Sequence, residues 1–263
     1  MKALITPLRP PLKWAGGKRW LIPKLEKLWK KHPHKRLVEP FCGGLSVALG
    51  LQAEKALLND VNFVVINFYK QIQQGLSLDI ALENDETAYY AHRTEFNRLN
   101  KLGASDKLTA QLFYYLNRTG YNGLCRFNQS GGYNVPFGRY KTINYQTDFS
   151  HYQTQLSAWD FTNQDFEKLI LQDDDFIYAD PPYDVPFRHY AQQGFSWEDQ
   201  ERLAHWLVQH KGPVVLSNQA TDRIITLYKA LGFKLYYLDA PRRISCKSSG
   251  RTAVKEVIAT RGF

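Results

Sequence analysis

Short apolar runs alternate with amphipathic stretches over the first 74 residues of the chain. The runs at 36–39 and 56–59 are suited to buried strands, and apolar positions recur at helical spacing in 19–31, 45–53 and 61–73. Strands that alternate with helices in this way indicate βαβ units and a parallel sheet.

The pattern changes near Gln74. Polar helical stretches cover 89–101 and 108–116, and a segment rich in Gly, Asn and aromatic residues follows at 117–140. The pair Gly131-Gly132 in that segment predicts a hairpin tip. We therefore predict an inserted domain over 75–150, with a hairpin at about 117–140, between two parts of a first domain at 1–74 and 151–263.

The alternation resumes at Trp159. Expected strands are 176–179, 213–217, 233–238 and 254–260, and expected helices are 197–209 and 222–230. No clear helix joins the last two strands, which predicts an antiparallel final pair on a mostly parallel sheet. In such a sheet the ligand site lies at the carboxyl ends of the strands. Residues that follow predicted strands would converge there: Phe41, Asp60, Asp165 and Asp180.

The tetrapeptide Asp180-Pro181-Pro182-Tyr183 directly follows the predicted strand 176–179. The carboxylate of Asp180 and the carbonyl of Pro181 could both accept hydrogen bonds from one exocyclic amino group, and Tyr183 could stack on the base that carries it. Enzymes that act on a base pulled out of the helix need such a pocket. The alternative is an ordinary Pro-Pro turn with Asp180 as a local acceptor.

Composition adds a charge argument. The formal net charge is +9 and the sequence pI is about 9.3, with Lys and Arg spread along the chain. A folded protein with this excess suits a polyanion, most commonly nucleic acid, although a generic basic surface is the alternative. The chain contains no apolar stretch near the ~18 residues of a membrane span and no secretory signal in residues 1–14, so we expect a cytoplasmic protein without a membrane partner.

Metal chemistry is not indicated. Cys42, Cys125 and Cys246 are widely spaced and lack a Cys-x-x-Cys pair, so neither a disulfide framework nor a zinc site is predicted. Among the seven histidines, His32 and His34 have no partner pair at ligand spacing. We predict no metal.

Four further motifs accompany the tetrapeptide. They are the glycine loop Lys13-Trp14-Ala15-Gly16-Gly17-Lys18, the turn Glu39-Pro40-Phe41-Cys42-Gly43-Gly44, the pair Asn59-Asp60, and the segment from Asn122-Gly123-Leu124-Cys125-Arg126-Phe127 to Asn134-Val135-Pro136-Phe137-Gly138-Arg139-Tyr140. Each motif is weak alone, but together the five are specific.

In this order and spacing, the motifs resemble the Dam family (class alpha) of site-specific DNA adenine-N6 methyltransferases, from Leu12 to about Ala259. The resemblance implies an α/β, Rossmann-like S-adenosylmethionine-dependent methyltransferase fold with an inserted helical and β-hairpin target-recognition domain. It implies methyl transfer from S-adenosyl-L-methionine to N6 of a flipped-out adenine in double-stranded DNA, with S-adenosyl-L-homocysteine as product and no metal. Family members with this Asn-Gly-Leu-Cys-Arg segment mostly recognise GATC.

The resemblance also assigns roles to residues. The catalytic set is Asp180, Pro181, Pro182 and Tyr183. The cofactor set is Trp14, Ala15, Gly16, Gly17, Lys18, Glu39, Pro40, Phe41, Gly43, Gly44, Asp60, Asp165, Phe166 and Asp180. The DNA set is Lys13, Arg118, Asn122, Leu124, Arg126, Asn134, Pro136, Arg139 and Tyr140. The implied partner is double-stranded DNA, with nucleoid association through DNA binding and no obligate protein partner evident.

Alternatives remain open at several positions. Asp60 could cap a helix starting near Val61, and Asp165 could cap one starting at Phe166. Arg126 and Arg139 could be surface charges, although Arg pairs bidentately with guanine. For the whole chain, the alternatives are another target sequence, an RNA substrate, or a catalytically inactive nucleic-acid-binding homologue.

Two departures from the family pattern are visible. Leu45 stands where many members have Gly, and Leu does not adopt positive φ cheaply, so we expect a local adjustment of the cofactor turn. The segment between Tyr183 and Phe187 is several residues shorter than usual, which bears on how a flipped base would be handled.

Overall fold

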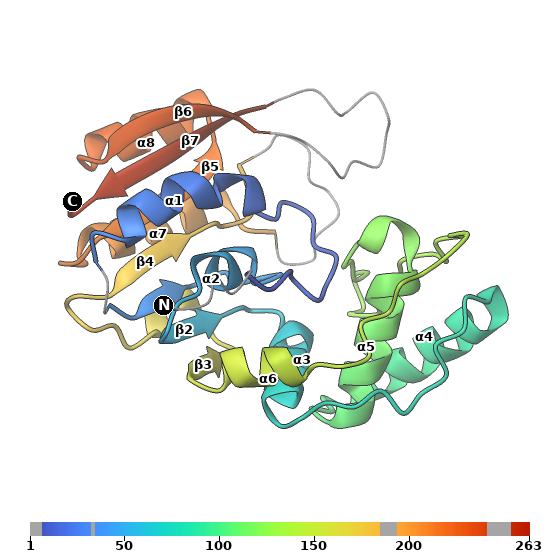
Figure 1. Cartoon of the computed structure of the whole chain (residues 1–263). Helices are drawn as coiled ribbons and strands as arrows, with labels where there is room; N and C mark the ends of the chain where they lie inside the picture. The colour runs from blue at the N-terminus through green and yellow to red at the C-terminus, as the bar shows by residue number, and fades with distance from the viewer. Residues whose placement is uncertain (1–6, 33–34, 185–193, 241–253) are drawn as a thin grey trace.

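The protein's structure, a computed structural model, describes residues 7–32, 35–184, 194–240 and 254–263 (Figure 1). A seven-stranded sheet forms its centre, in the order β3-β2-β1-β4-β5-β7-β6. The strands are β1 (Leu37–Glu39), β2 (Ala56–Asn59), β3 (Trp159–Thr162), β4 (Phe176–Ala179), β5 (Val214–Gln219), β6 (Lys234–Ala240) and β7 (Val254–Arg261). Neighbours from β3 to β5 pair in parallel, and β7 is antiparallel to both β5 and β6, which confirms the predicted sheet.

The helices cover both faces of this sheet (Figure 1). They are α1 (Ile22–Trp29), α2 (Ser46–Leu51), α3 (Phe63–Gln73), α4 (Glu86–Lys101), α5 (Lys107–Thr119), α6 (Ser150–Leu156), α7 (Trp197–Val208) and α8 (Asp222–Ala230), with 3-10 turns η1 (Arg19–Leu21), η2 (Tyr121–Gly123) and η3 (Phe166–Lys168). Side chains of β4 alternate between two cores because successive residues of a strand point to opposite faces. Phe176 and Tyr178 pack on the side of α1 to α3, and Ile177 and Ala179 on the side of α7 and α8.

The predicted helices and strands are present, but several boundaries differ and one helix was not predicted. The helix predicted over 19–31 is a 3-10 turn followed by α1, with a proline in the first turn of α1. The helix predicted over 45–53 covers only Ser46–Leu51. Helix α6 was not predicted, because its sequence Ser-His-Tyr-Gln-Thr-Gln-Leu has only two buried positions, Tyr152 and Leu156.

Helices α4 and α5 lie to one side of the sheet in Figure 1, and α5 packs against α3. Each begins at an aspartate that caps it, Asp85 for α4 and Asp106 for α5. Phe113, Tyr114 and Tyr115 of α5 are fully buried, so they belong to the core. These helices fall within the predicted insertion 75–150, whose status as a separate domain stays a prediction.

The segment after α5 folds back on itself without forming a regular strand pair. Isolated bridges join Gly120 to Phe137 and Phe127 to Tyr133 in antiparallel sense. At the far end, Asn128 N–H donates to the carbonyl of Gly132 over 2.8 Å, and Gly131 has a φ of 78°, which glycine adopts readily. The predicted tip is therefore present, and the arms are irregular.

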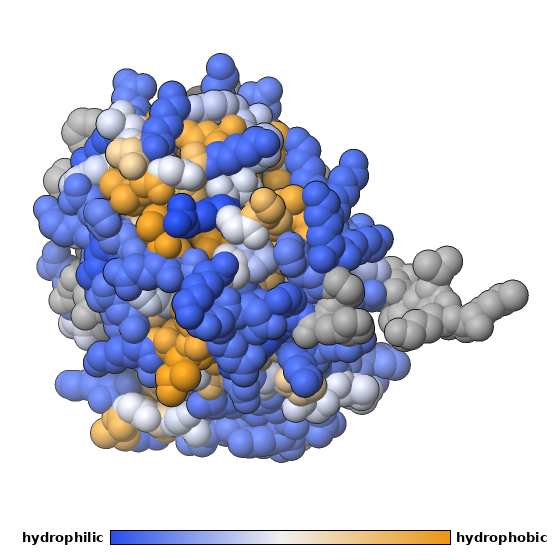
Figure 2. Space-filling view, turned by 90° about the vertical axis from the view of Figure 1, so that its left-hand side faces the viewer, coloured by the Kyte–Doolittle hydropathy of each residue, from blue (hydrophilic) through white to orange (hydrophobic). Residues whose placement is uncertain are grey.

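The surface toward the left of Figure 1 is mostly hydrophilic, with scattered hydrophobic patches (Figure 2). Within the described ranges, no helix has the length and apolar character needed to cross a membrane. Four features from the sequence lie outside the described residues: His34, the part of the short segment after Tyr183 that follows Asp184, Cys246, and most of the loop before β7.

Candidate active site

Residues that follow β1, β2 and β3 meet at one edge of the sheet. Asn59 Nδ2 at the end of β2 donates to the carbonyl of Pro40, beyond β1, at 3.0 Å and to that of Gln164, beyond β3, at 2.9 Å. The rings of Phe41 and Phe166 lie 5.8 Å apart between their centroids. The residues expected to converge here from β1, β2 and β3 therefore do so.

Asp180 stands at the end of β4 with both carboxylate oxygens engaged. Lys18 Nζ lies 2.8 Å from Oδ2, and Ser217 Oγ, on neighbouring β5, donates to Oδ1 at 2.7 Å. The Lys18 side chain is only 4% exposed, and that of Asp180 is 20% exposed. The carboxylate is therefore fixed in orientation while part of it faces solvent. Sequence reasoning did not single out Ser217, although it occupies the carboxyl end of a predicted strand.

Tyr183 lies beside this ion pair. Lys18 Nζ is 4.8 Å from the centroid of its ring, a cation–π distance. Burial raises the pKa of the Tyr183 hydroxyl, and the nearby carboxylates of Asp180 and Glu256 raise it further. The phenol therefore stays protonated, and its ring is held next to the carboxylate.

A buried amide network holds the backbone of the tetrapeptide. Gln200 Nε2 donates to the carbonyl of Pro182 at 2.8 Å, and Asn218 Nδ2 donates to Gln200 Oε1 at 2.9 Å. Asp184 N–H donates to Asn218 Oδ1 at 3.3 Å. Gln200 and Asn218 come from α7 and β5, so elements far apart in sequence fix this turn. No sequence motif pointed to them.

The turn after β1 is built around Trp14. A Cβ added to Gly43 would lie 2.5 Å from the indole Nε1, and one added to Gly44 would lie 2.6 Å from Trp14 Cβ. Both positions therefore need glycine. Gly43 N–H also donates to Asp60 Oδ2 at 2.9 Å, which ties the turn to the end of β2.

Asp60 does not cap α3. Asn62 is the N-cap, and its side chain accepts from Val64 N–H. Asp60 Oδ1 instead accepts from Asn62 N–H at 2.9 Å, in addition to the bond from Gly43. Burial raises the pKa of Asp60, and the two backbone donors oppose that change. The capping alternative is therefore wrong, and the carboxylate is oriented between two turns.

Leu45 adopts the left-handed conformation that glycine would take at this position. Its φ is 59° and its ψ is 26°, which is the left-handed region, and its side chain is fully buried. Positive φ costs a non-glycine residue roughly 1–2 kcal/mol, and burying a Leu side chain contributes about 2 kcal/mol, so burial is of the size needed to offset the strain. Whether the turn is adjusted relative to a glycine-containing turn stays a prediction.

Asp165 caps η3, as its sequence alternative suggested. Its side chain accepts from Glu167 N–H at 3.0 Å. The same carboxylate forms a two-pronged ion pair with Arg202, at 3.1 and 2.9 Å. These contacts hold the pKa of Asp165 below its usual range in spite of partial burial.

Phe195, which the sequence pattern did not indicate, packs edge-on against Phe41 with ring centroids 5.5 Å apart.

Glu39 ends β1 and is 3% exposed. Within the described residues its Oε1 has no hydrogen-bond partner. Burial raises the pKa of Glu39 strongly, a backbone hydrogen bond from Ala48 opposes the change, and the charge on Asp180 adds to it. A buried acceptor without a partner beside a glycine turn is suited to a bound donor group.

The residues assigned to DNA reading surround the turn 120–138. Arg126 Nε donates to Asn134 Oδ1 at 2.7 Å, and Arg139 Nη2 contacts both carboxylate oxygens of Glu86 at 2.8 Å. Arg126, Pro136 and Arg139 are exposed, while Arg118, Asn122, Leu124, Asn134 and Tyr140 are partly exposed. Asn122 itself has a φ of 53°, within η2.

Lys13 connects this segment to the glycine loop. Its Nζ donates to the carbonyl of Arg118 at 2.8 Å and lies 4.0 Å from the centroid of the Tyr140 ring. Desolvation, and to a smaller degree the charge of Arg118, lowers the pKa of Lys13 to about 8. Its charge therefore depends on pH within an accessible range.

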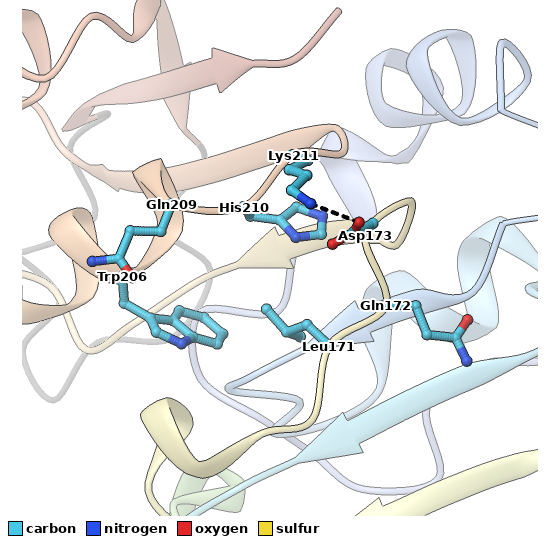
Figure 3. Close-up of a pocket in the computed structure, with 7 residues that line it drawn as sticks. All are labelled: Leu171, Gln172, Asp173, Trp206, Gln209, His210 and Lys211. Atoms are coloured by element: carbon cyan, nitrogen blue, oxygen red, sulfur yellow. Dashed lines mark hydrogen bonds and ion pairs between the residues drawn. The ribbon is translucent and has the colours of Figure 1, made fainter.

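A pocket elsewhere on the surface contains none of these residues. Figure 3 shows it between the chain that precedes β4 and the chain that precedes β5, at the opposite ends of the strands. It is lined by Leu171, Gln172, Asp173, Trp206, Gln209, His210 and Lys211. In the described part of the chain, no three His, Cys, Asp or Glu side chains are grouped to hold a metal ion.

The fold and this constellation define an α/β methyltransferase: a mostly parallel sheet with antiparallel β7, and Asp-Pro-Pro-Tyr at the end of β4. The model of the D12 class N6 adenine-specific DNA methyltransferase family matches residues 14–244. The chain belongs to this family, and it is a DNA adenine methyltransferase.

Curated relatives agree along nearly the whole chain. The retron Ec67 DNA adenine methylase of Escherichia coli is 35% identical, over 95% of this chain and 90% of its own. The type II methyltransferase M1.LlaDCHI of Lactococcus lactis subsp. cremoris is 36% identical, over 96% and 95%. The DNA adenine methylase of Escherichia coli strain K12 is 34% identical, over 94% and 93%.

Proposed function

We propose that the protein transfers a methyl group from S-adenosyl-L-methionine to N6 of an adenine flipped out of double-stranded DNA, within GATC. The observation that carries the proposal is Asp180, held by Lys18 and Ser217 with its carboxylate 20% exposed next to the Tyr183 ring. The target sequence rests on the resemblance of the segment Asn122 to Tyr140 to GATC-reading members of the Dam family.

The residues at the carboxyl ends of the strands fit this cofactor. Asp60 is already oriented by two backbone N–H groups, and each oxygen keeps a lone pair for a ribose hydroxyl. The unpartnered Oε1 of Glu39 suits a donor such as the amino group of the methionine part. Phe41, which is only partly buried and packs against the buried ring of Phe166, offers a ring surface for an adenine.

The cofactor supplies an activated methyl group on a sulfonium, so the protein needs no nucleophile of its own. The chain's task is to orient the adenine amine, whose nitrogen lone pair is delocalised into the ring. Asp180 Oδ1 and Oδ2 each accept one bond within the protein, which leaves acceptor capacity for an N–H of the substrate. With the carbonyl of Pro181 as second acceptor, the lone pair is directed at the methyl group.

Asp180 also stabilises the positive charge that develops on N6 during transfer. Tyr183 stacks on the adenine, and its raised pKa keeps the phenol neutral there. Because an adenine inside a duplex could not reach a partly buried carboxylate, flipping is part of the proposal. The segment within 75–150 would read the duplex through its exposed Arg126 and Arg139.

A protection assay tests the proposal. Purified protein, S-adenosyl-L-methionine and a plasmid with GATC sites are incubated, and the plasmid is cut with one nuclease blocked by adenine methylation at GATC and one that requires it. We expect reciprocal protection and cutting. Labelled methyl entering DNA without a change at GATC would overturn the target assignment, and no label in DNA would contradict the proposed reaction.

A further inference from the structure

The buried side-chain amide of Asn117 in α5 is bonded to both backbone groups of Lys13. Asn117 Nδ2 donates to the Lys13 carbonyl at 2.9 Å, and Lys13 N–H donates to Asn117 Oδ1 at 2.8 Å. Asn117 is fully buried. One side chain thus supplies the two hydrogen bonds that a neighbouring strand would give, and it fixes the Lys13 backbone to α5.

The side chain of Lys13 packs against residues 118–140, which we call the reading segment. Besides its contacts with Arg118 and the Tyr140 ring, it packs so closely on Gly123 that a Cβ added there would lie 2.2 Å from Lys13 Cβ. Movement of Lys13 and movement of the turn at Gly123 are therefore coupled by direct contact.

The next residue belongs to the cofactor turn. Trp14 packs against Gly43 and Gly44, and Gly43 is bonded to Asp60. Two adjacent residues therefore face the two proposed binding sites, and the Asn117 amide fixes the backbone of the first.

We propose that Asn117 is a positioning residue that couples DNA recognition to cofactor binding, an inference that rests on the proposed function. Contacts that DNA makes around Lys13 order Trp14 against the glycine turn only while the amide holds the backbone between them. By linkage, each ligand then raises the affinity for the other by the same factor. Without the amide, the two sites bind independently.

The chain offers a matched control. Asn97 of α4 makes the same pair of bonds to Tyr133, accepting from its N–H at 2.7 Å and donating to its carbonyl at 3.1 Å. This amide holds the reading segment but has no bond to the Lys13–Trp14 region. Asn97→Ala therefore loosens the reading segment without cutting the proposed connection.

The experiment measures the Kd of S-adenosyl-L-homocysteine by calorimetry, alone and with a saturating GATC duplex or a scrambled duplex. For the unchanged protein we expect the GATC duplex to tighten cofactor binding about fivefold or more. Asn117→Ala should reduce that ratio to below about twofold. Asn97→Ala should weaken duplex binding and keep the ratio.

Asn117→Asp serves as the second variant, because it has the same shape and keeps the acceptor for Lys13 N–H while losing the donor to the carbonyl. We expect an intermediate ratio, with thermal unfolding confirming that each variant is folded. The inference alone is overturned if the folded variants at Asn117 show the same duplex-induced tightening of S-adenosyl-L-homocysteine binding as the unchanged protein. It is also overturned if the duplex does not change the Kd of the unchanged protein. Failure of the unchanged protein to bind either ligand overturns the proposed function instead.

Discussion

The carboxyl end of the sheet and the reading segment organise their polar groups in opposite ways. At the sheet, Asp180, Lys18 and Ser217 are bonded to one another in an arrangement that the proposed reaction uses as it stands. In the reading segment, Arg126 and Arg139 are bonded to Asn134 and Glu86, which occupy the groups that DNA would contact. Under the proposed function, the carboxyl end of the sheet is preorganised, whereas we expect the reading segment to exchange partners when it binds DNA.

This difference follows from burial. A charge removed from water must be paired permanently, because an unpaired buried charge costs several kcal/mol. An exposed ion pair contributes about 0–1 kcal/mol, so it is broken at little cost. We therefore expect changes at the sheet to reduce turnover, and changes in the reading segment to alter DNA affinity and its dependence on salt.

Removal of the carboxylate tests the preorganised end most severely. Asp180→Ala should lower methyl transfer about 10³-fold or more, because it removes both the acceptor and the charge stabilisation. Binding of S-adenosyl-L-homocysteine should stay mostly intact, measured by calorimetry. Since Lys18 loses its partner, thermal unfolding serves as the control for folding. Near-normal turnover in a folded variant would refute the role of Asp180.

The glycine turn tests whether steric preorganisation extends to the cofactor. Gly44→Ala places a Cβ 2.6 Å from Trp14 Cβ, so we expect cofactor affinity to fall about tenfold to a hundredfold. Gly103→Ala is the control for a Gly→Ala change as such, because its added Cβ meets nothing within 4 Å, and its φ of 68° is strained for Ala whereas Gly44 has no positive φ. Equal cofactor affinity in the two variants would show that Trp14 moves aside freely.

The sequence was sufficient for the sheet and for the residues that follow its strands. Apolar runs such as Phe176–Ala179 are local signals, and the carboxyl ends of parallel strands meet wherever such a sheet forms. It was insufficient for the groups that hold the site in place. Gln200 and Asn218 are ordinary polar residues in the sequence, and their role exists only because α7 and β5 pack together.

The reading segment was harder to predict from the sequence, because its structure also depends on packing between distant residues. The turn at Gly131 could be predicted from its glycines. The two arms of the segment on either side of it have no regular alternation of apolar and polar residues, and in the structure they form only isolated bridges. Leu45 gives a further example. The sequence raised the conflict between Leu and positive φ, and only the structure showed that Leu45 takes a positive φ with its side chain fully buried.

Lys13 sharpens the comparison because it is bonded to the reading segment and directly precedes Trp14, which packs against the glycine turn at the sheet. Its pKa of about 8 means that the charge is lost as pH rises, and DNA that favours the charged form would raise this pKa on binding. Affinity should therefore be flat below about pH 8 and fall above it, by at most about tenfold per pH unit. Lys13→Arg stays charged, so its affinity should lack this fall. Identical pH profiles from fluorescence anisotropy would exclude Lys13 from the interface.

The smallest expected effect on DNA affinity comes from breaking the ion pair between Arg139 and Glu86. Glu86→Ala frees Arg139, so DNA affinity should rise by at most about fivefold, since an exposed pair contributes no more than about 1 kcal/mol. Glu95→Ala is the matched control, because it removes another exposed carboxylate of α4 that is paired with Arg98. A larger gain in DNA affinity from Glu86→Ala than from Glu95→Ala separates release of Arg139 from a general change in charge.

Arg139→Ala should in turn weaken DNA binding and reduce the slope of log K against log salt concentration by about one. An unchanged slope would mean that Arg139 keeps Glu86 as its partner on DNA, and the reading segment would then be as preorganised as the sheet.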